Sequence, residues 1–445
     1  MEKFIINGGK PLKGEIALGG AKNVALKICV ASLLTDEELI LHNVPNISDV
    51  VLMFNVLKSL GVSIGVEGST VRIKQGPINN SSVPLEVGAR LRTSSMVLGQ
   101  LLTRTGTATV PNPGGCRIGA RPIDRHIEGL RQMGANVTYV SEDGFFHASA
   151  EGLHGITYSF EKNTHTGTET LILAAVLADG RTILKNAAEE VEIDDLISCL
   201  NQMGANVRRT NNREITIEGV EKLHGTDFTI MPDRNEEVTF AIAAMVTGGD
   251  MTMINSQQQY LTSFFAALDE AGGGYEKISD SETRYFRPQK LMPTSIITAP
   301  HPGFMTDWQA PWAVLMTQAK GVSTIHETVF ESRFSYVDEL GKMGAEIKSY
   351  EPKVTDPQNF YNFNLKDRQS GSHQAIRISG PTKLHNAVVD IADLRAGATL
   401  VLAALSAEGE SYIGGIEQID RGYEKIEEKL HKLGASIERI TEDQV

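Results

Sequence analysis

The chain has 445 residues, 41% of them hydrophobic, and a formal net charge of −13 at pH 7. This length exceeds what one hydrophobic core usually supports, so two or three domains are expected. The negative charge argues against binding nucleic acid or an anionic membrane through the overall field of the protein. The sequence contains no apolar run long enough to span a bilayer and no N-terminal signal core, so we expect a cytoplasmic protein.

A short signature, Leu-x-x-(Leu/Met/Ala)-Gly, recurs six times and predicts one repeated supersecondary unit. In the third copy, Ile193, Leu196 and Leu200 fall on one face of a helix, so each signature is expected to end an amphipathic helix. We expect the glycine to stop the helix in a left-handed conformation, before two strands. The six copies end at Gly61, Gly134, Gly204, Gly272, Gly344 and Gly434. The last spacing is longer because of an insertion-like stretch, residues 351–372, that predicts a loop.

Between the signatures lies a second set of six segments that are nearly all apolar, as is typical of helices buried on every side. They cover residues 25–34, 95–102, 170–177, 239–246, 310–318 and 398–405. Each unit therefore holds two helices and several strands. Two groups of three units, each group around its own buried helices, is the simplest packing, and a doubly wound α/β fold is the alternative.

Polar or charged residues stand at or just before the starts of five apolar helices. They are Lys22, Arg92, Arg234, Asp307 and Arg395, four of them cationic. A cation at the positive end of a helix is locally unfavourable. The pattern therefore suggests a shared anion-binding cleft where these helix ends meet, and scattered solvated charges are the alternative.

Cys116 lies in a loop rich in glycine and proline, near Arg117 and Arg121. Cationic neighbours lower the pKa of a thiol, so this pattern predicts a reactive cysteine, with a structural role as the alternative. Cys29 and Cys199 fall within apolar helical patterns and are expected to be buried. Three cysteines without a signal peptide argue against a disulfide framework. The sequence has no metal-ligand spacing, Walker-type loop or dinucleotide fingerprint, so we expect neither a metal nor a cofactor.

Six segments, in order along the whole chain, resemble the UDP-N-acetylglucosamine 1-carboxyvinyltransferases, a family of enolpyruvyl transferases. They are residues 20–23 (GAKN), 113–122 (PGGCRIGARP), 298–307 (TAPHP and TD), 327–334 (ETVFESRF), 393–396 (DLRA) and 419–424 (IDRGYE). The resemblance implies an α/β fold of two inside-out barrels, each of three units, joined by a two-stranded hinge with a cleft between them. Residues 22–231 would form the barrel that carries the Cys116 loop. Residues 1–21 and 232–445 would form the barrel that carries Asp307, Arg333, Arg395 and Arg421.

The resemblance also implies the reaction, the transfer of enolpyruvyl from phosphoenolpyruvate to the 3-hydroxyl of UDP-N-acetylglucosamine, with release of phosphate. This addition and elimination is the first committed step of peptidoglycan precursor synthesis, and fosfomycin inhibits it at the cysteine. Both substrates are small molecules, and we expect no nucleic acid, membrane or obligate protein partner. The alternatives are an enolpyruvyl transferase with another nucleotide or a shikimate-type acceptor, and a non-catalytic paralogue that binds UDP-sugar.

Residue roles follow from the same resemblance. Lys22, Arg121 and Arg421 would face the phosphate, and Arg333 and Arg395 would face the carboxylate of phosphoenolpyruvate. Asp307 matches the candidate base for the sugar hydroxyl, and Cys116 matches the acid that protonates the methylene carbon. The catalytic set would be Cys116, Asp307, Lys22 and Arg395. The nucleotide sugar would be held by Asn23, Arg92, Arg121, Pro122, Ile123, Asp124, Arg125, Asp307 and Val329, and by a strip of Lys162, Thr164, His165 and Thr166.

Plainer interpretations exist for several of these residues. Asp307 could serve only as a helix cap, and Asp393 with Arg395 could be a surface ion pair. Trp308 and Trp312 lie four residues apart directly after Asp307, and they are the two tryptophans of the chain. We expect Trp308 to report nucleotide-sugar binding through its emission, with two buried core rings as the alternative.

Overall fold

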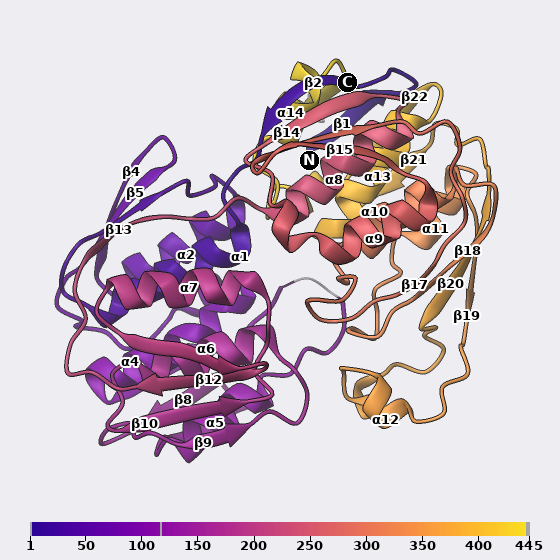
Figure 1. Cartoon of the computed structure of the whole chain (residues 1–445). Coiled ribbons are helices and arrows are strands. Elements are labelled where there is room, and N and C mark those ends of the chain that lie inside the picture. The colour runs from indigo at the N-terminus through magenta and orange to yellow at the C-terminus, as the bar shows by residue number, and fades with distance from the viewer. Residues whose placement is uncertain (1, 116–117, 442–445) are drawn as a thin grey trace. The chain divides into compact units, whose positions relative to one another are not determined.

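A computed structural model describes residues 2–115 and 118–441, which form two compact units. Within the described residues, unit 1 comprises 2–19, 118–121 and 232–441, and unit 2 comprises 20–115 and 122–231 (Figure 1). The chain passes between the units after Gly19 and after Met231, and it also passes between them on either side of residues 118–121. Residues 118–121 group with unit 1, although the sequence assigned the Cys116 loop to residues 22–231.

Unit 2 contains three repeats, each with its own sheet. The first has β3 (Leu39–His42), β4 (Val62–Glu67), β5 (Thr70–Gln75) and β13 (Thr226–Thr229), with α1 (Lys22–Ala31), η1 (Ser32–Leu34) and α2 (Ser48–Ser59). The second has β6 (Thr107–Pro111), β7 (Asn136–Val140) and β8 (Phe145–Ser149), with α3 (Leu85–Gly88), η2 (Arg92–Met96), α4 (Val97–Thr105) and α5 (Asp124–Gln132). The third has β9 (Thr157–Ser159), β10 (Arg181–Lys185), β11 (Asn206–Asn211) and β12 (Glu214–Glu218), with α6 (His165–Ala175) and α7 (Val191–Gln202).

Unit 1 also contains three repeats. The first has β2 (Lys13–Ala17), β14 (Asp250–Ile254), β15 (Gly274–Ser279) and β16 (Glu282–Phe286), with α8 (Arg234–Val246), η3 (Gln258–Tyr260) and α9 (Thr262–Ala271). The second has β17 (Ser295–Ile297), β18 (Gly321–His326), β19 (Glu346–Tyr350) and β20 (Ala375–Gly380), with α10 (Gln309–Met316), α11 (Val337–Lys342), α12 (Pro357–Phe360) and η4 (Leu365–Asp367). The third has β1 (Glu2–Asn7), β21 (Val388–Asp390), β22 (Glu410–Gly414) and β23 (Ser436–Thr441), with α13 (Leu394–Ser406), η5 (Ile416–Gln418) and α14 (Ile426–Lys432).

One strand order runs through all six sheets. In the third repeat of unit 2, β9 pairs parallel with β10 across α6, and an antiparallel series β10–β12–β11 completes the sheet. The same order appears as β17–β18–β20–β19 and as β21–β22–β1–β23. The sheet of β6, β8 and β7 lacks only the outer parallel strand, and a parallel bridge from Ser82 to Thr109 stands in its place. The predicted repeated unit is therefore confirmed, and the structure adds its strand order.

The signature helices are α2, α5, α7, α9, α11 and α14, each of which ends within two residues of its glycine. All six glycines have a positive φ, from 69° at Gly272 to 102° at Gly134. An L-residue with a Cβ atom is strained in this range, so the glycine lets the chain turn from the helix into the next strand. The predicted helix stops are confirmed.

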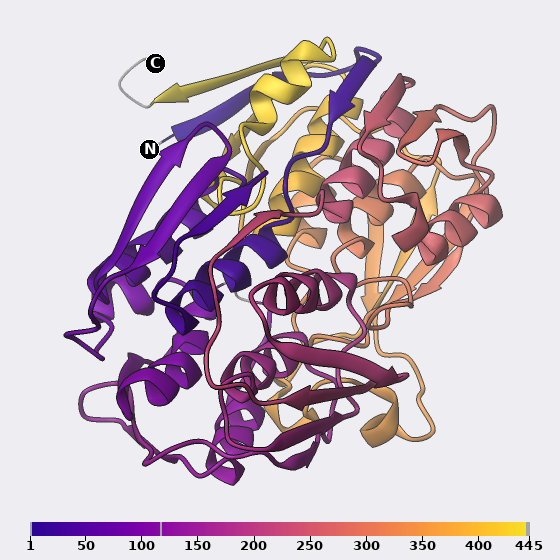
Figure 2. The same cartoon turned by 60° about the vertical axis from the view of Figure 1, so that its left-hand side comes forward.

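The apolar helices form the two cores. Every residue of α8 and α10 is buried, and α8, α10 and α13 contact one another in unit 1. In unit 2, α4 contacts both α1 and α6. The strands around them alternate between buried and exposed residues, and the views show the sheets around the helices of each unit (Figure 2). The predicted class, two α/β barrels with helices inside and sheets outside, is confirmed.

The tryptophans belong to the core of unit 1, because Trp308 and Trp312 are both fully buried. The indole N–H of Trp308 donates to Asn235 Oδ1 at 2.9 Å, and that of Trp312 donates to Thr294 Oγ1 at 3.1 Å. Both rings also meet Phe264 edge-on. The alternative of two buried core rings is therefore correct, and it removes the reason for expecting Trp308 to report a ligand.

The insertion of residues 351–372 is not only a loop. It contains α12 and η4, and it returns Tyr361 and Phe363 to buried positions. Tyr361 contacts His326 of β18, whose Nε2 lies 3.1 Å from the tyrosine hydroxyl. Across the described residues, none of the helices is long and apolar enough to cross a bilayer.

Candidate active site

A buried cluster of two arginines and two aspartates forms in unit 1. Arg333 makes an ion pair with Asp307 and lies 3.6 Å from Asp393, and Arg395 Nε lies 3.6 Å from Asp307 Oδ1. Asp307 has 24% of its side chain exposed, whereas the other three have 7% or less. Asp307 is therefore the member of the cluster that is most open to a substrate.

Helix starts position this cluster. Asp393 is the N-cap of α13, and its Oδ1 accepts hydrogen bonds from the amides of Arg395 (3.0 Å) and Ala396 (3.1 Å). The cap fixes the first turn, on which Arg395 stands. Because Asp393 and Arg395 are both buried, the interpretation of a surface pair is wrong. The N-cap residue of α10 is Trp308, which makes no side-chain cap.

Glu327 supports this cluster, although no separate role was predicted for it from the sequence. Its Oε1 accepts hydrogen bonds from the amides of Val329 (2.7 Å) and Phe330 (3.1 Å), and its Oε2 accepts one from Thr306 (2.9 Å). Burial raises the pKa of Glu327, against the opposing effect of Arg333. Glu327 thereby fixes the backbone of Val329 and the side chain of Thr306, the residue before Asp307. The one sign of this role in the sequence was that Glu327 begins the ETVFESRF segment.

The charges of the cluster hold one another in place. Burial opposes the charge of Arg333, but the carboxylates of Asp307, Asp393 and Glu327 outweigh it and raise the pKa of the guanidinium. Buried charges need this kind of compensation, because an isolated one would cost several kcal/mol. The arginines therefore stay charged and oriented before any substrate binds.

The segment after Cys116 is fixed to the same part of unit 1. The amide of Ala120 donates to Glu331 Oε1 at 2.6 Å, and the amide of Ser332 donates to Ile118 O at 3.2 Å. The guanidinium of Arg121 lies 5.6 Å from the centre of the Phe330 ring. The backbone of Arg121 itself has a positive φ of 47°. The predicted reactive residue Cys116 lies outside the described residues.

Arg421, predicted to face a phosphate, lies in the turn between η5 and α14 of unit 1. Its Nη1 donates to Gln418 Oε1 at 3.3 Å. The next aromatic residue, Tyr423, is buried and accepts a hydrogen bond from Arg395 at 2.9 Å. The IDRGYE segment and the DLRA segment are thus brought together in space.

Unit 2 carries the other predicted residues. Lys22 and Asn23 are the first two residues of α1, and Arg92 is the first residue of η2. Lys22 Nζ lies 2.9 Å from Asp49 Oδ2, and the side chains are 12% and 4% exposed. Asp49 offsets the cost of a lysine at the positive end of a helix. Asp49 was not predicted from the sequence. Its one distinguishing feature there is that it is an acidic residue in the first turn of the next helix, α2.

The two nucleotide-sugar segments meet where α5 and α6 begin. Ile123 is the N-cap residue of α5, directly after Pro122 and before Asp124 and Arg125. His126 Nε2, one residue further, lies 2.9 Å from Thr166 Oγ1 on α6. The segment 122–125 and the strip that includes Thr166 are therefore neighbours in unit 2.

The strip itself is the start of α6. Thr164 is the N-cap residue and accepts a hydrogen bond from the Gly167 amide at 3.2 Å, and Lys162 is buried just before it. His165 Nε2 lies 3.1 Å from Glu169 Oε1. Burial opposes the charge of His165, but the carboxylate of Glu169 outweighs it and raises the pKa of the imidazole.

A second ion pair lies behind this strip. Lys27 Nζ is 3.3 Å from Glu169 Oε2, and both side chains are buried. Sequence reasoning missed both residues, although a lysine within the apolar segment 25–34 was a visible irregularity. The pair connects α1, which carries Lys22, to α6, which carries His165.

Arg234 departs from the anion-site hypothesis for helix starts. It is fully buried in unit 1, and its Nη1 donates to His301 Nδ1 at 3.0 Å. Its guanidinium also lies 5.8 Å from the centre of the Trp308 ring. The guanidinium of Arg234 therefore interacts with residues inside the core of unit 1.

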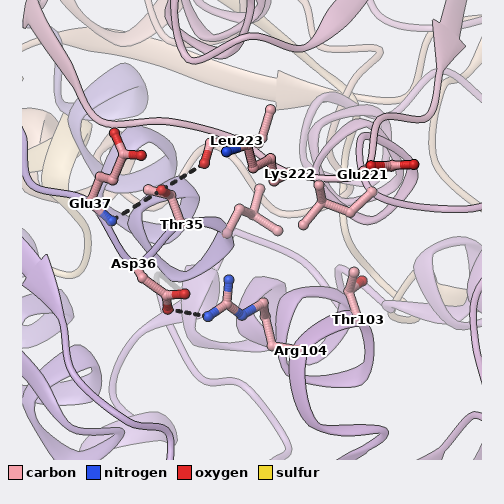
Figure 3. A pocket seen from close by; sticks show the side chains of 10 residues that line it. Thr35, Asp36, Glu37, Thr103, Arg104, Glu221, Lys222 and Leu223 are labelled. Carbon is pink, nitrogen blue, oxygen red and sulfur yellow. Dashed lines mark hydrogen bonds and ion pairs between the residues drawn. The ribbon is translucent and has the colours of Figure 1, made fainter.

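Unit 2 also has a separate polar pocket of about 430 Å³, shown in Figure 3. Arg104 pairs with Asp36 on one wall, and Thr35 donates to the carbonyl of Leu223 at 2.9 Å on another. None of the predicted site residues lines this pocket.

Comparisons with known proteins agree with this arrangement. Residues 6–430 match the family model of EPSP synthase (3-phosphoshikimate 1-carboxyvinyltransferase). The UDP-N-acetylglucosamine 1-carboxyvinyltransferase of Acidobacterium capsulatum is 43% identical over 444 residues, covering 99% of this chain and 96% of that protein. The enzyme of the same name from Magnetococcus marinus is 43% identical over 441 residues, covering 99% of this chain and all of that protein.

Two solved structures share the fold. The enolpyruvyl transferase NikO from Streptomyces tendae superimposes with a TM-score of 0.86 at 22% identity, covering 99% of both chains. EPSP synthase from Acinetobacter baumannii gives 0.75 at 19% identity, covering 99% of this chain and all of that one. The match of the family model and the full-length relatives together confirm the resemblance seen in the sequence, and the chain belongs to the EPSP synthase family of enolpyruvyl transferases.

Proposed function

We propose that this protein transfers enolpyruvyl from phosphoenolpyruvate to the 3-hydroxyl of UDP-N-acetylglucosamine and releases phosphate. The observation that carries the proposal is the cluster in which Asp307, partly exposed, lies between the guanidinium groups of Arg333 and Arg395. Relatives 43% identical over nearly the whole chain bear the name of this activity. The proposal places the reaction in the cytoplasm.

The cluster suits a substrate that carries a carboxylate. Arginine binds carboxylates through two parallel hydrogen bonds, and both arginines are held in place before binding. A substrate carboxylate that binds them replaces part of their interaction with Asp307. The proposal therefore assigns Arg333 and Arg395 to the carboxylate of phosphoenolpyruvate, and it frees Asp307 to accept a proton.

The chemistry proceeds in two steps. In the addition, Asp307 takes the proton of the sugar 3-hydroxyl as its oxygen bonds to C2 of phosphoenolpyruvate, and the methylene carbon gains a proton, which the resemblance assigns to Cys116. The product is a tetrahedral ketal that still carries the phosphate. In the elimination, the methyl group would return a proton to the thiolate of Cys116, the double bond re-forms, and the bond between C2 and the phosphate oxygen breaks to release phosphate. Lys22, Arg121 and Arg421 would stabilise the departing phosphate by their charge.

The remaining predicted residues would bind the nucleotide sugar. Asn23 and Arg92 stand at helix starts in unit 2, and the neighbouring starts of α5 and α6 carry residues 122–125 and the strip from Lys162 to Thr166. Helix N-termini offer free amides and positive potential to a diphosphate. This supports assigning nucleotide binding to unit 2.

Phosphate release tests the proposal. The purified chain is incubated with phosphoenolpyruvate and UDP-N-acetylglucosamine together, with each alone, and with phosphoenolpyruvate plus shikimate 3-phosphate. We expect release only with the first pair. Release with shikimate 3-phosphate in place of the nucleotide sugar would refute the acceptor, and binding of UDP-N-acetylglucosamine without turnover would refute catalysis.

Two variants test the role of Asp307. Asp307→Asn keeps the shape of the side chain but cannot take the hydroxyl proton, so we expect a loss of at least about 100-fold in kcat. Asp269→Asn is the matched control, because Asp269 is an exposed aspartate on α9 of the same unit, outside the cluster. Equal kinetics for the two variants would contradict the assignment.

A further inference from the structure

Tyr423 contacts the guanidinium of Arg395 at a different nitrogen from the one nearest to Asp307. Arg395 Nη1 donates to the Tyr423 hydroxyl at 2.9 Å, and the guanidinium carbon lies 5.4 Å from the centre of the tyrosine ring. The tyrosine is 1% exposed, so it cannot swing out into water without opening the core of unit 1. The contact is a hydrogen bond to a charged group, which is stronger than one between neutral groups.

The hydrogens of this contact can be assigned from their partners. Thr239 Oγ1 on α8 lies 3.0 Å from the carbonyl oxygen of Asn235 and 2.7 Å from the Tyr423 hydroxyl. A carbonyl only accepts, so the single hydroxyl hydrogen of Thr239 goes to Asn235. The Tyr423 hydrogen then goes to Thr239, and the tyrosine oxygen accepts from Arg395. Burial raises the pKa of Tyr423, so this hydroxyl keeps its proton at neutral pH.

This chain of hydrogen bonds occupies one edge of the Arg395 guanidinium and leaves another edge available for a ligand. Nη1 donates to Tyr423, and Nε lies 3.6 Å from Asp307 Oδ1. Among the described residues, Nη2 makes no hydrogen bond. Nε and Nη2 form the side edge of the guanidinium, which can bind both oxygens of a carboxylate at once.

We propose that Tyr423 is a positioning residue that fixes Arg395 so that its Nε and Nη2 edge receives the carboxylate of phosphoenolpyruvate. Thr239 acts one step behind it by fixing the direction of the tyrosine hydroxyl. A guanidinium without this support can rotate about the terminal bonds of its side chain and present other edges. Part of the binding free energy of the substrate is then lost in ordering that side chain. This inference rests on the proposed function of Arg395.

Tyr423→Phe is the direct test, because it removes one oxygen and keeps the ring. We expect kcat/KM for phosphoenolpyruvate to fall about tenfold, as for the loss of one hydrogen bond to a charged group, while KM for UDP-N-acetylglucosamine changes by less than about twofold. A purely structural role would not separate the two substrates in this way. Wild-type kinetics for phosphoenolpyruvate, or equal changes for both substrates, would overturn the inference.

Tyr285→Phe is the matched control. Tyr285 is also a fully buried tyrosine of unit 1, and its hydroxyl donates to the buried carboxyl group of Glu237 at Oε1 (2.9 Å). Its hydrogen bond and its ring contact with Phe265, within the described residues, involve none of the site arginines. Its variant should lose thermal stability comparably to Tyr423→Phe and keep the kinetics for phosphoenolpyruvate. A similar kinetic loss in both variants would overturn the inference, because it would trace the effect to the core.

Thr239→Val tests the second step. Valine has the shape of threonine but cannot accept the tyrosine hydrogen, so we expect a smaller change in the same direction, about threefold. The double variant should lose less than the product of the two single losses, because both act through one contact. Fully multiplicative losses would contradict a shared route.

Failure of the inference and failure of the proposed function give different results. If the wild type releases no phosphate, the proposed function is wrong and the inference falls with it. If the wild type is active and Arg395→Ala loses activity with phosphoenolpyruvate while Tyr423→Phe does not, only the inference is wrong.

Discussion

Asp195→Asn is expected to stabilise unit 2 at neutral pH. Asp195 lies on α7, and its Oδ2 accepts a hydrogen bond from the amide of Met231 at 3.1 Å. Burial raises the pKa of this carboxyl from its ordinary value of 3.8 to about 6, because the one amide does not replace the water that it loses. Asparagine keeps an acceptor for Met231 and carries no charge.

The sign follows from proton binding. Between pH 3.8 and about 6 the native state holds a proton on Asp195 that the unfolded state has released, so stability falls as the pH rises through this window. Above this window the wild type bears the full cost of the buried charge. The whole pKa shift corresponds to about 3 kcal/mol at most, and because the side chain of Asp195 is partly exposed we expect about 1.5–3 kcal/mol. For a unit of this size the variant should melt about 3–10 °C higher at pH 8, with the gain vanishing near pH 4.

Calorimetry is the suitable assay, because both tryptophans lie in unit 1 and their emission follows that unit. Glu128→Gln is the control, since Glu128 is an exposed carboxylate on α5 of unit 2 and its loss should change stability by less than about 0.5 kcal/mol. An Asp195→Asn chain that is no more stable than the wild type at pH 8, or a gain that persists at pH 4, would refute the reasoning.

Burial raises the pKa of both Cys29 and Cys199 to about 12, so we expect peptide mapping after fosfomycin treatment to find the adduct on Cys116, and labelling of Cys29 at a similar rate would contradict this. Arg395→Ala should lower kcat/KM for phosphoenolpyruvate at least about tenfold with an unchanged circular dichroism spectrum, and near-normal rates at limiting phosphoenolpyruvate would count against it. Gly204→Ala should destabilise unit 2 by about 1–2 kcal/mol in calorimetry, because alanine is strained at a φ of 99°, and an unchanged melting temperature would show that the turn relaxes.

The repeat could be predicted from the sequence because its signals are local. A helix face, a glycine that ends the helix and a following strand all lie within about 20 residues. The structure predicted for the signature that ends at Gly204 therefore applies to all six copies. The same is true of the buried helices, whose composition alone indicates that no face meets water.

Long-range partners could not be predicted in this way. Arg234 stands at a helix start like Arg395, yet its guanidinium donates to His301, 67 residues away, and serves the core. Nothing in the local sequence distinguishes these two arginines. Likewise, the segment at Ala120 belongs to unit 1 because of a carboxylate 211 residues further along, at Glu331.

The position of β1 has a consequence for how the chain folds as it is made. This strand lies between β22 and β23, and Asn7 donates a hydrogen bond to Glu410, which is 403 residues away. At a synthesis rate of about 5–20 residues per second, β1 leaves the ribosome roughly 20–90 s before both of its neighbours exist. Unit 2, almost all of it one continuous stretch, can complete its core in that interval. Phe4 and Ile6, both buried in the finished sheet, stay exposed to chaperones and to other nascent chains until the last strands emerge.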